Sequence, residues 1–222
     1  MRLPFSITLA VSLLAAGVSH GAPEFTNETD KAVYALGLAA AAQLTEFDLS
    51  EREFVLLAAG MADGHHGEPV VSLEEYGPRI AELGRERATR RMAVEMRESE
   101  AFLVAAAAEP GARKTETGLI IRETQVGDGD MPGALDSVKV HYHGTLRDGL
   151  VFDSSVERGE PVVFPLERVI PCWTEALQRM KVGAKAVIHC PADLAYRDRG
   201  AAEGLIGPGA ALRFEVELLG IE

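Results

Sequence analysis

The chain has 222 residues, 47% of them hydrophobic and 25% charged, which is typical of a globular protein with one large domain or two small ones. Its 34 acidic residues outnumber its 22 basic residues, so the formal net charge is −12. This balance argues against a nucleic-acid partner, because phosphate binding requires a basic surface.

The first 21 residues have the features of a secretory signal peptide. Arg2 supplies a positive charge, an apolar run extends from about Phe5 to Val18, and the small residues Ser19 and Gly21 suit cleavage after Gly21. The run is shorter than the roughly 20 residues of a comfortable membrane span. We therefore expect an exported protein, with an uncleaved N-terminal anchor as the alternative. The sequence leaves open whether the protein stays free in the periplasm or associates with the outer membrane.

The segment from about Thr26 to Ala108 has the pattern of an all-helical region. Apolar residues recur at three-four spacing over 30–44. The serine and glutamate at the two ends of 50–53 and of 72–75 form capping-box patterns, and each predicts the start of a further helix. Between these helices, glycine and proline over 64–69 predict a break.

The third predicted helix contains Gly77-Pro78, which we expect to kink or restart it, since proline lacks the N–H that would donate to Glu74. No residue from Arg79 to Ala108 stops a helix, so this segment can run for about 30 residues, or about 45 Å. Charges lie on nearly all of its sides. It therefore fits a solvated stalk that connects two domains.

After Ala112 the hydrophobic period changes from 3.6 to 2. Alternation predicts strands over 138–146 and 212–218, and two more apolar runs predict strands over 119–124 and 186–190. The only helix expected in this half spans about 173–180. An antiparallel sheet with one helix against it is an α+β architecture.

Cys172 and Cys190 are the two cysteines, and a single pair is not a disulfide framework. An exported chain can keep a bridge, but the pattern favours two buried unbridged side chains, with the bridge as the alternative. His141 and His143 would lie on one face of a strand. They lack a third ligand at a useful spacing, so we expect no metal site.

Several blocks of the C-terminal half resemble the FKBP domain in content, order and spacing. They are VHYHGTL (140–146), VFDSS (151–155), FPL (164–166), VIPCW (169–173), PADLAY (191–196) and the run IGPGAALRFEVELL (206–219). The resemblance covers about Lys114 to Glu222. The N-terminal half, with YALG at 34–37 and EEYGP at 74–78, is similar to the dimerisation domain of exported bacterial FKBPs, the macrophage infectivity potentiator group.

The resemblance implies a peptidyl-prolyl cis-trans isomerase that needs neither metal nor cofactor. It implies a signal peptide at 1–21, a helical dimerisation domain with a long linker helix at 22–112, and an FKBP-type domain at 113–222, in which an antiparallel sheet wraps on a short helix. The tryptophan would form the floor of a proline pocket, aromatic rings its walls, and the aspartate and second tyrosine its rim. The implied catalytic residues are Tyr142, Phe152, Asp153, Tyr196 and Phe214. The implied substrate-binding residues are Val169, Ile170, Trp173, Ile206 and Val162.

The partners implied are unfolded, proline-containing polypeptides, macrolide inhibitors such as rapamycin, and a second copy bound through the N-terminal helices. Two other functions fit the same fold. One is a periplasmic folding chaperone in which isomerisation is incidental, and the other is a binding module with a catalytically silent pocket.

This chain departs from the family pattern at three positions. Cys172 and Arg197 stand where the family usually has glycine, and Val162 stands where many members have an aromatic wall residue. We expect these changes to alter sequence preference and turnover rather than to abolish activity.

Overall fold

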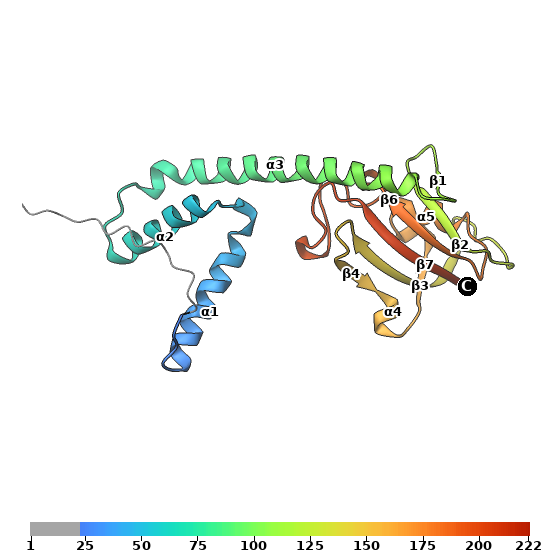
Figure 1. Cartoon of the computed structure of the whole chain (residues 1–222), viewed down its shortest axis with the longest axis horizontal. Coiled ribbons are helices and arrows are strands. Elements are labelled where there is room, and N and C mark those ends of the chain that lie inside the picture. Colours follow the sequence, from blue (N-terminus) through green and yellow to red (C-terminus); the bar gives the residue numbers. More distant parts are fainter. Residues whose placement is uncertain (1–22) are drawn as a thin grey trace, which may run out of the picture. The chain divides into compact units, whose positions relative to one another are not determined.

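The computed structural model describes residues 23–222, so the predicted signal peptide lies outside the described residues. The chain forms two compact units with a boundary after Thr45 (Figure 1). None of the described helices is both long and apolar enough to cross a membrane.

The first unit contains helix α1 (Glu28–Gln43), as the three-four spacing predicts. The helix begins at Asn27, whose side-chain oxygen accepts a hydrogen bond from the Asp30 N–H at 3.0 Å. No residue of α1 is buried, and the apolar side chain of Leu36 is 70% exposed. A short 3-10 helix, η1 (Thr45–Phe47), follows α1 in the chain.

Helix α2 (Glu51–His66) begins with the predicted capping box. The Ser50 hydroxyl accepts from the Glu53 N–H, and the Glu53 carboxylate accepts from the Ser50 N–H at 2.9 Å. Gly67 ends the helix with φ of 73°, in the left-handed region that favours glycine. Like α1, α2 has no buried residue.

Helix α3 (Leu73–Ala107) is a single helix of 35 residues that begins after the N-cap Ser72. It is continuous through Pro78, so the predicted restart at Gly77-Pro78 does not occur. The proline removes one backbone hydrogen bond, and the regular turns on both sides hold the helix across that gap. Only Ser99 and Ala106 are buried, which confirms the prediction that the helix buries little of itself.

The C-terminal half contains a seven-stranded sheet in which every pairing is antiparallel (Figure 1). The order is β1-β2-β6-β7-β3-β4, and β5 pairs with β3. The strands are β1 (Arg113–Lys114), β2 (Ile120–Gln125), β3 (Ser137–Leu146), β4 (Val151–Ser154), β5 (Val162–Pro165), β6 (Lys185–Cys190) and β7 (Leu212–Ile221). The four strands predicted from the sequence are present, and β1, β4 and β5 were not predicted.

The prediction of a single helical stretch in this half is wrong. Helix α5 (Pro171–Leu177) corresponds to the predicted one, but a short α4 (Ser155–Arg158) precedes it. Helix α4 starts because the Ser154 hydroxyl accepts from the Glu157 N–H at 3.1 Å, and four residues are too few to show a period. The 3-10 helices are η2 (Leu166–Arg168), η3 (Ala192–Leu194) and η4 (Ala202–Gly204).

The hydrophobic core lies between one face of the sheet and α5. Alternate residues of β3 and β7, among them Val140 and Leu218, are fully buried there together with Ala176 and Leu177 of α5. This alternation of buried and exposed positions is what the period of 2 predicted.

A disulfide joins Cys172 to Cys190, with the two Cα atoms 5.7 Å apart. Both cysteines are fully buried. The bridge ties the first turn of α5 to the end of β6, and it decides between the two alternatives that the sequence left open.

Candidate functional site

A cavity of about 390 Å³ opens beside α5 on the core side of the sheet. Strands β3, β4, β5 and β7, helix α5 and two loops contribute to its walls. The lining residues are Tyr142, Phe152, Asp153, Phe164, Arg168, Val169, Ile170, Trp173, Tyr196 and Phe214.

Trp173 lies at the centre of an aromatic cluster in this cavity. Its ring meets Tyr142 at 5.2 Å, Phe164 at 5.6 Å and Phe214 at 5.3 Å between centroids, with interplanar angles of 78° to 89°. These edge-to-face contacts are the arrangement that aromatic quadrupoles favour. The indole is 5% exposed, and within the described chain its N–H has no hydrogen-bond partner. The packing against three rings therefore fixes the indole as the floor of the cavity.

Phe152 and Phe214 form one wall, in edge-to-face contact at 5.4 Å. Gly144 of β3 makes room for this pair, because a Cβ atom there would lie 2.7 Å from the Phe152 ring and 3.0 Å from the Phe214 ring. The first distance is too short for a real contact and the second is tighter than most, so the wall depends on glycine at this position of the strand.

The rim carries three polar side chains joined to one another. The Tyr142 hydroxyl donates to Asp153 Oδ2 at 2.5 Å, the Arg158 guanidinium forms an ion pair with Asp153 Oδ1, and Arg158 Nη2 donates to the Tyr142 hydroxyl at 3.0 Å. Each of the three groups therefore orients the other two.

These contacts keep the Asp153 carboxylate ionised. Partial burial raises its pKa, but the hydrogen bonds from Tyr142 and Arg158 outweigh that effect and leave the pKa below its usual value. Burial, and then the hydrogen bond with Asp153, raises the pKa of Tyr142. Near neutral pH the rim thus presents a carboxylate with a neutral phenol, and Asp153 cannot serve as a proton donor.

Tyr196 borders the cavity from the loop after η3, and it is 36% exposed. Burial, followed by the nearby Asp153 charge, raises the pKa of its hydroxyl. The next residue, Arg197, has φ of 53°, in the left-handed region that favours glycine. An arginine here therefore strains the backbone beside Tyr196, at one of the positions where the chain departs from the family pattern.

Eight of the ten residues that the resemblance implied line this one cavity, and two do not. Ile206 is 2% exposed and belongs to the hydrophobic core. Val162 lies opposite Val140 in the β3–β5 pairing, half-buried against the same core. A valine is too short to reach the cavity from β5.

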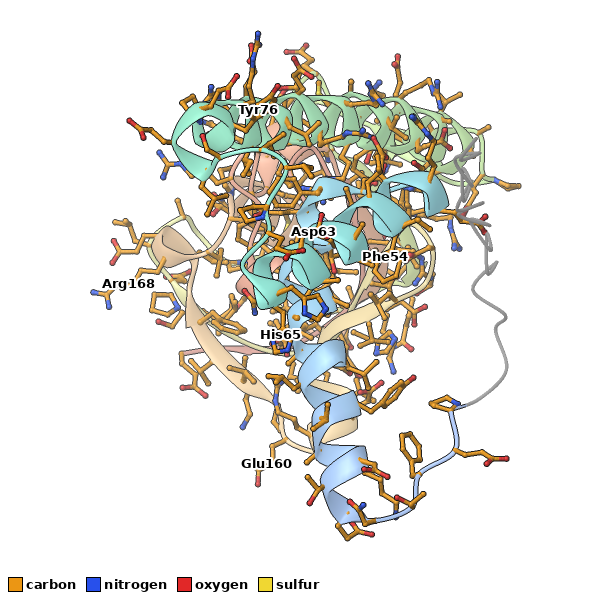
Figure 2. The ribbon with its side chains drawn as sticks, turned by 90° about the vertical axis from the view of Figure 1, so that its left-hand side faces the viewer. Phe54, Asp63, His65, Tyr76, Glu160 and Arg168 are labelled. Atoms are coloured by element: carbon orange, nitrogen blue, oxygen red, sulfur yellow. A yellow bond between two sulfur atoms is a disulfide. The ribbon has the colours of Figure 1, made fainter. Side chains whose placement is uncertain are left out.

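Sequence reasoning missed three residues of the site. Phe164 supplies the aromatic wall from β5 in place of Val162, and the FPL block that contains it was the available signal. Arg168 lies at the rim with a side chain that is 78% exposed, and it projects from the domain in Figure 2. Arg158 reaches Asp153 from α4. No pattern indicated this contact, because α4 was not predicted.

The two histidines of β3 lie on the opposite face of the sheet from the cavity. His141 and His143 form hydrogen bonds through Nδ1 with Ser155 at 3.1 Å and Ser154 at 3.0 Å. Over residues 23–222, no group of three histidine, cysteine or acidic side chains is placed to hold a metal ion.

Comparison with known families identifies both halves of the chain. Residues 129–219 match the family described as FKBP-type peptidyl-prolyl cis-trans isomerase. Residues 29–122 match the domain described as amino terminal to FKBP-type peptidyl-prolyl isomerase.

Individual relatives extend the similarity to almost the whole chain. The FKBP-type 22 kDa peptidyl-prolyl cis-trans isomerase of Escherichia coli is 41% identical over 90% of this chain and 98% of its own. The peptidyl-prolyl cis-trans isomerase Mip of Coxiella burnetii is 35% identical over 99% of this chain and 97% of its own. FkpA of Aeromonas hydrophila is 47% identical over 68% of this chain, and the match spans 55% of that longer protein.

The crystal structure of FkpA from Escherichia coli has the same architecture. It superposes with a TM-score of 0.69 and 32% identity, and the match covers 90% of this chain and 99% of that one. Together with the aromatic cavity, the relatives that match along almost their entire length settle the family. The chain belongs to the FKBP-type peptidyl-prolyl cis-trans isomerases, in the group that includes FkpA and Mip.

Proposed function

We propose that the cavity around Trp173 is the catalytic site and that it accelerates rotation about X-Pro peptide bonds in exported polypeptides as they fold. Resonance gives a peptide bond a rotational barrier of about 18–20 kcal/mol. At X-Pro the two isomers differ by only about 0.5–1 kcal/mol, and they exchange over tens to hundreds of seconds without a catalyst. A folding chain therefore gains from a catalyst of this step.

The observation that carries the proposal is the apolar, aromatic cavity with one fixed polar rim. In the twisted amide the resonance is lost, so this form is less dipolar than the planar ground state. An apolar site that excludes water disfavours the planar form, and a shape that fits the twisted form adds binding found only in the transition state. Trp173 would contact the proline ring from below, and Phe152 and Phe214 would enclose it from one side.

The rim residues would position the backbone on either side of the proline. An ionised Asp153, fixed by Tyr142 and Arg158, can accept a hydrogen bond from a substrate N–H. The Tyr196 hydroxyl is protonated near neutral pH, and its raised pKa keeps it so, so it can donate to a substrate carbonyl. Neither role requires covalent catalysis, a metal or a proton transfer to the substrate.

The chain from Ala22 onward tests this proposal in an isomerisation assay with short X-Pro peptides, with and without rapamycin. We expect acceleration that rapamycin inhibits, and a loss of about 100-fold or more in kcat/KM in the Phe152→Ala/Asp153→Ala double variant, which removes one wall and the rim carboxylate. Val126→Ala, which truncates a side chain that is 78% exposed and outside the cavity, is the matched control.

A double variant that stays folded and keeps its full activity would place the active site elsewhere. A folded wild-type protein without activity would favour the silent binding module. In that case Arg197→Gly, which relieves the left-handed backbone strain beside Tyr196, is the first variant to test for gain of activity.

We further propose that the N-terminal helices form a homodimer. Neither α1 nor α2 has a buried residue, yet both carry large apolar side chains, and Val33, Phe54 and Met61 are 64%, 53% and 58% exposed. Figure 2 labels Phe54 on α2 and Tyr76 on α3. Such surfaces mark association sites in soluble proteins. Light scattering after size-exclusion chromatography should give twice the chain mass, and a monomer at micromolar concentration would contradict the dimer.

The same apolar surfaces support a chaperone activity as the second candidate. Helices that expose this much apolar surface could hold an unfolded client while the C-terminal domain acts on its prolines. A fragment of residues 22–112 that suppresses aggregation of an unfolded client would support this role.

Export is a separate proposal, which rests on the segment 1–21. Cell fractionation with detection of the mature chain tests it.

A further inference from the structure

Four residues on one face of α3 contact the C-terminal domain. Met92, Glu95, Met96 and Ser99 follow the i, i+3, i+4, i+7 spacing that places helix residues side by side. We call them the Ser99 face of α3. Each makes a contact with one of two segments that adjoin the cavity, and none of these contacts has a part in the chemistry proposed above.

The first contact holds the segment that leads into β7. The buried Ser99 hydroxyl accepts a hydrogen bond from the Ala211 N–H at 2.8 Å and donates to Glu95 Oε1 at 3.2 Å. Ala211 is fully buried, and Phe214 of the cavity wall follows three residues later. The helix thus supplies the partner for a backbone N–H that would otherwise be buried without one.

A second contact lies at Gly209 in the same segment. Gly209 has φ of 82°, and a Cβ atom there would lie 2.7 Å from Met96 Cγ and 3.6 Å from Met92 Cγ. On its other side, the Gly209 N–H donates to the Arg197 carbonyl at 2.7 Å. The segment therefore lies between the Ser99 face and the residue that follows Tyr196.

The third contact holds the turn that leads into β4. Glu95 forms a two-pronged ion pair with Arg147, in which Nε–Oε1 and Nη2–Oε2 are both 3.1 Å. Arg147 lies in the turn between β3 and β4, the strands that carry Tyr142 on one side and Phe152 and Asp153 on the other. A paired guanidinium and carboxylate fix both position and direction.

We propose that the Ser99 face of α3 is a positioning element for the proline pocket, so that a helix of the N-terminal half sets the geometry of a site to which it contributes no lining residue. One face of the helix holds both the Gly209–Ala211 segment and the β3–β4 turn. The first segment leads to Phe214 on β7 and the second to Phe152 on β4, which meet in one wall of the cavity. The pairing of Leu146 with Leu212 fixes the strand ends, and α3 fixes the two segments beyond that pairing, on which catalytic efficiency depends. The inference rests on the proposed function, since it concerns the same cavity.

Trp173 makes the proposal measurable apart from activity, because it is the single tryptophan of the chain and forms the cavity floor. Its fluorescence therefore reports the pocket. We expect Ser99→Ala, in the chain from Ala22 onward, to shift the Trp173 emission and to lower kcat/KM about 10-fold, since a 1 Å displacement of a catalytic group can cost about 100-fold. Ser99→Thr keeps the hydroxyl and should restore both values.

Gly209→Ala gives an independent test. It introduces left-handed strain and a clash with Met96, whereas Gly204→Ala, at φ of 94° and with no atom within 4 Å, introduces the strain alone. We expect Gly209→Ala to lower kcat/KM about 10-fold, Gly204→Ala to change it less than 2-fold, and Met96→Ala to recover part of the Gly209→Ala loss.

A purely structural role would lower the denaturation midpoint in these variants and leave the emission and kcat/KM of the folded protein unchanged. That result in Ser99→Ala, or Gly209→Ala and Gly204→Ala behaving alike, would overturn the proposal. An inactive wild type would contradict the proposed function alone, because the emission shift and its restoration by threonine would still test the positioning by α3.

Discussion

The N-terminal helices and the C-terminal domain use apolar residues in opposite ways. In the C-terminal domain, strands and α5 bury their apolar side chains against one another, and residues such as Leu177 and Leu218 have no exposed surface. Helices α1 and α2 bury none of theirs. Since burial of apolar surface is the main stabilising contribution to folding, the C-terminal domain gains this contribution within one chain, whereas α1 and α2 gain little of it there.

The largest effect that tests this contrast comes from core truncation. Leu177→Ala should lower the free energy of unfolding by about 2–5 kcal/mol, because it leaves a cavity in a closed core. Leu36→Ala truncates a side chain that is 70% exposed, so it should change the stability of a monomer by less than about 0.5 kcal/mol. Urea denaturation measures both values. A cost at Leu36 as large as that at Leu177, at every protein concentration, would contradict the contrast.

The disulfide provides the next largest effect. It closes a loop with a sequence separation of 18, and by the chain-entropy estimate it stabilises the domain by about 3 kcal/mol. Cys172→Ala/Cys190→Ala should lower the denaturation midpoint by the corresponding amount without changing the helices that precede α3. Equal denaturation curves for this variant and the oxidised wild type would show that the bridge adds nothing.

The pH dependence of stability should depend on His189 of β6. The ring is 3% exposed, packs edge-to-face on Phe102 of α3 at 5.2 Å, and its Nδ1 has no partner in the described chain. Burial first, and then the charge of Arg213, lowers its pKa from 6.5 to about 4; Glu109 opposes this shift, and Arg122 adds the smallest lowering effect.

Because the unfolded chain binds a proton that the folded chain excludes, stability should fall as the pH drops from about 6.5 to about 4. The fall from this group should amount to about 2–3 kcal/mol. Denaturation of His189→Phe across this range should lack that component. A wild-type slope that persists unchanged in the variant would assign it to other groups, such as Asp153, whose lowered pKa also makes stability fall toward acid.

The smallest effect concerns the capping box of α2. Ser50→Ala removes the hydroxyl that accepts from the Glu53 N–H, and it should destabilise the helix by about 1 kcal/mol. Since no buried residue holds α2 in place, this change should appear as local loss of helix and as faster amide exchange there, while the C-terminal domain keeps its midpoint. If Ser50→Ala instead destabilised the C-terminal domain together with α2, the two regions would fold as one cooperative unit.

Local signals in the sequence predicted much of the architecture. The period of 2 placed β3 and β7, and both helix starts at Ser50 and Ser72 were evident from their patterns. Strands β4 and β5 were missed because each has four residues, too few for alternation to be distinguished from a loop. Pro78 was expected to interrupt α3, since a local rule cannot weigh one missing hydrogen bond against the turns around it.

The resemblance implied most of the residues that line the cavity, but it did not indicate every side chain of the walls and rim. Eight of the residues that line the cavity were named in advance. From β5, however, the long side chain of Phe164 lines the cavity, whereas the shorter Val162 packs against the core. Arg158 was missed because the short helix α4, which brings it to Asp153, was not predicted.

The sequence by itself determined the family, the division into a helical half and a sheet half, and the residue types of an apolar pocket, because these depend on periodicity and on local motifs. Only the tertiary structure decided that Cys172 meets Cys190, that Arg158 joins the rim, and that Ser99 receives the Ala211 N–H. The separations of these contacts in the chain range from 5 residues, for Arg158 and Asp153, to 112, for Ser99 and Ala211. Their existence depends on how strands and helices pack in three dimensions, which no local pattern records.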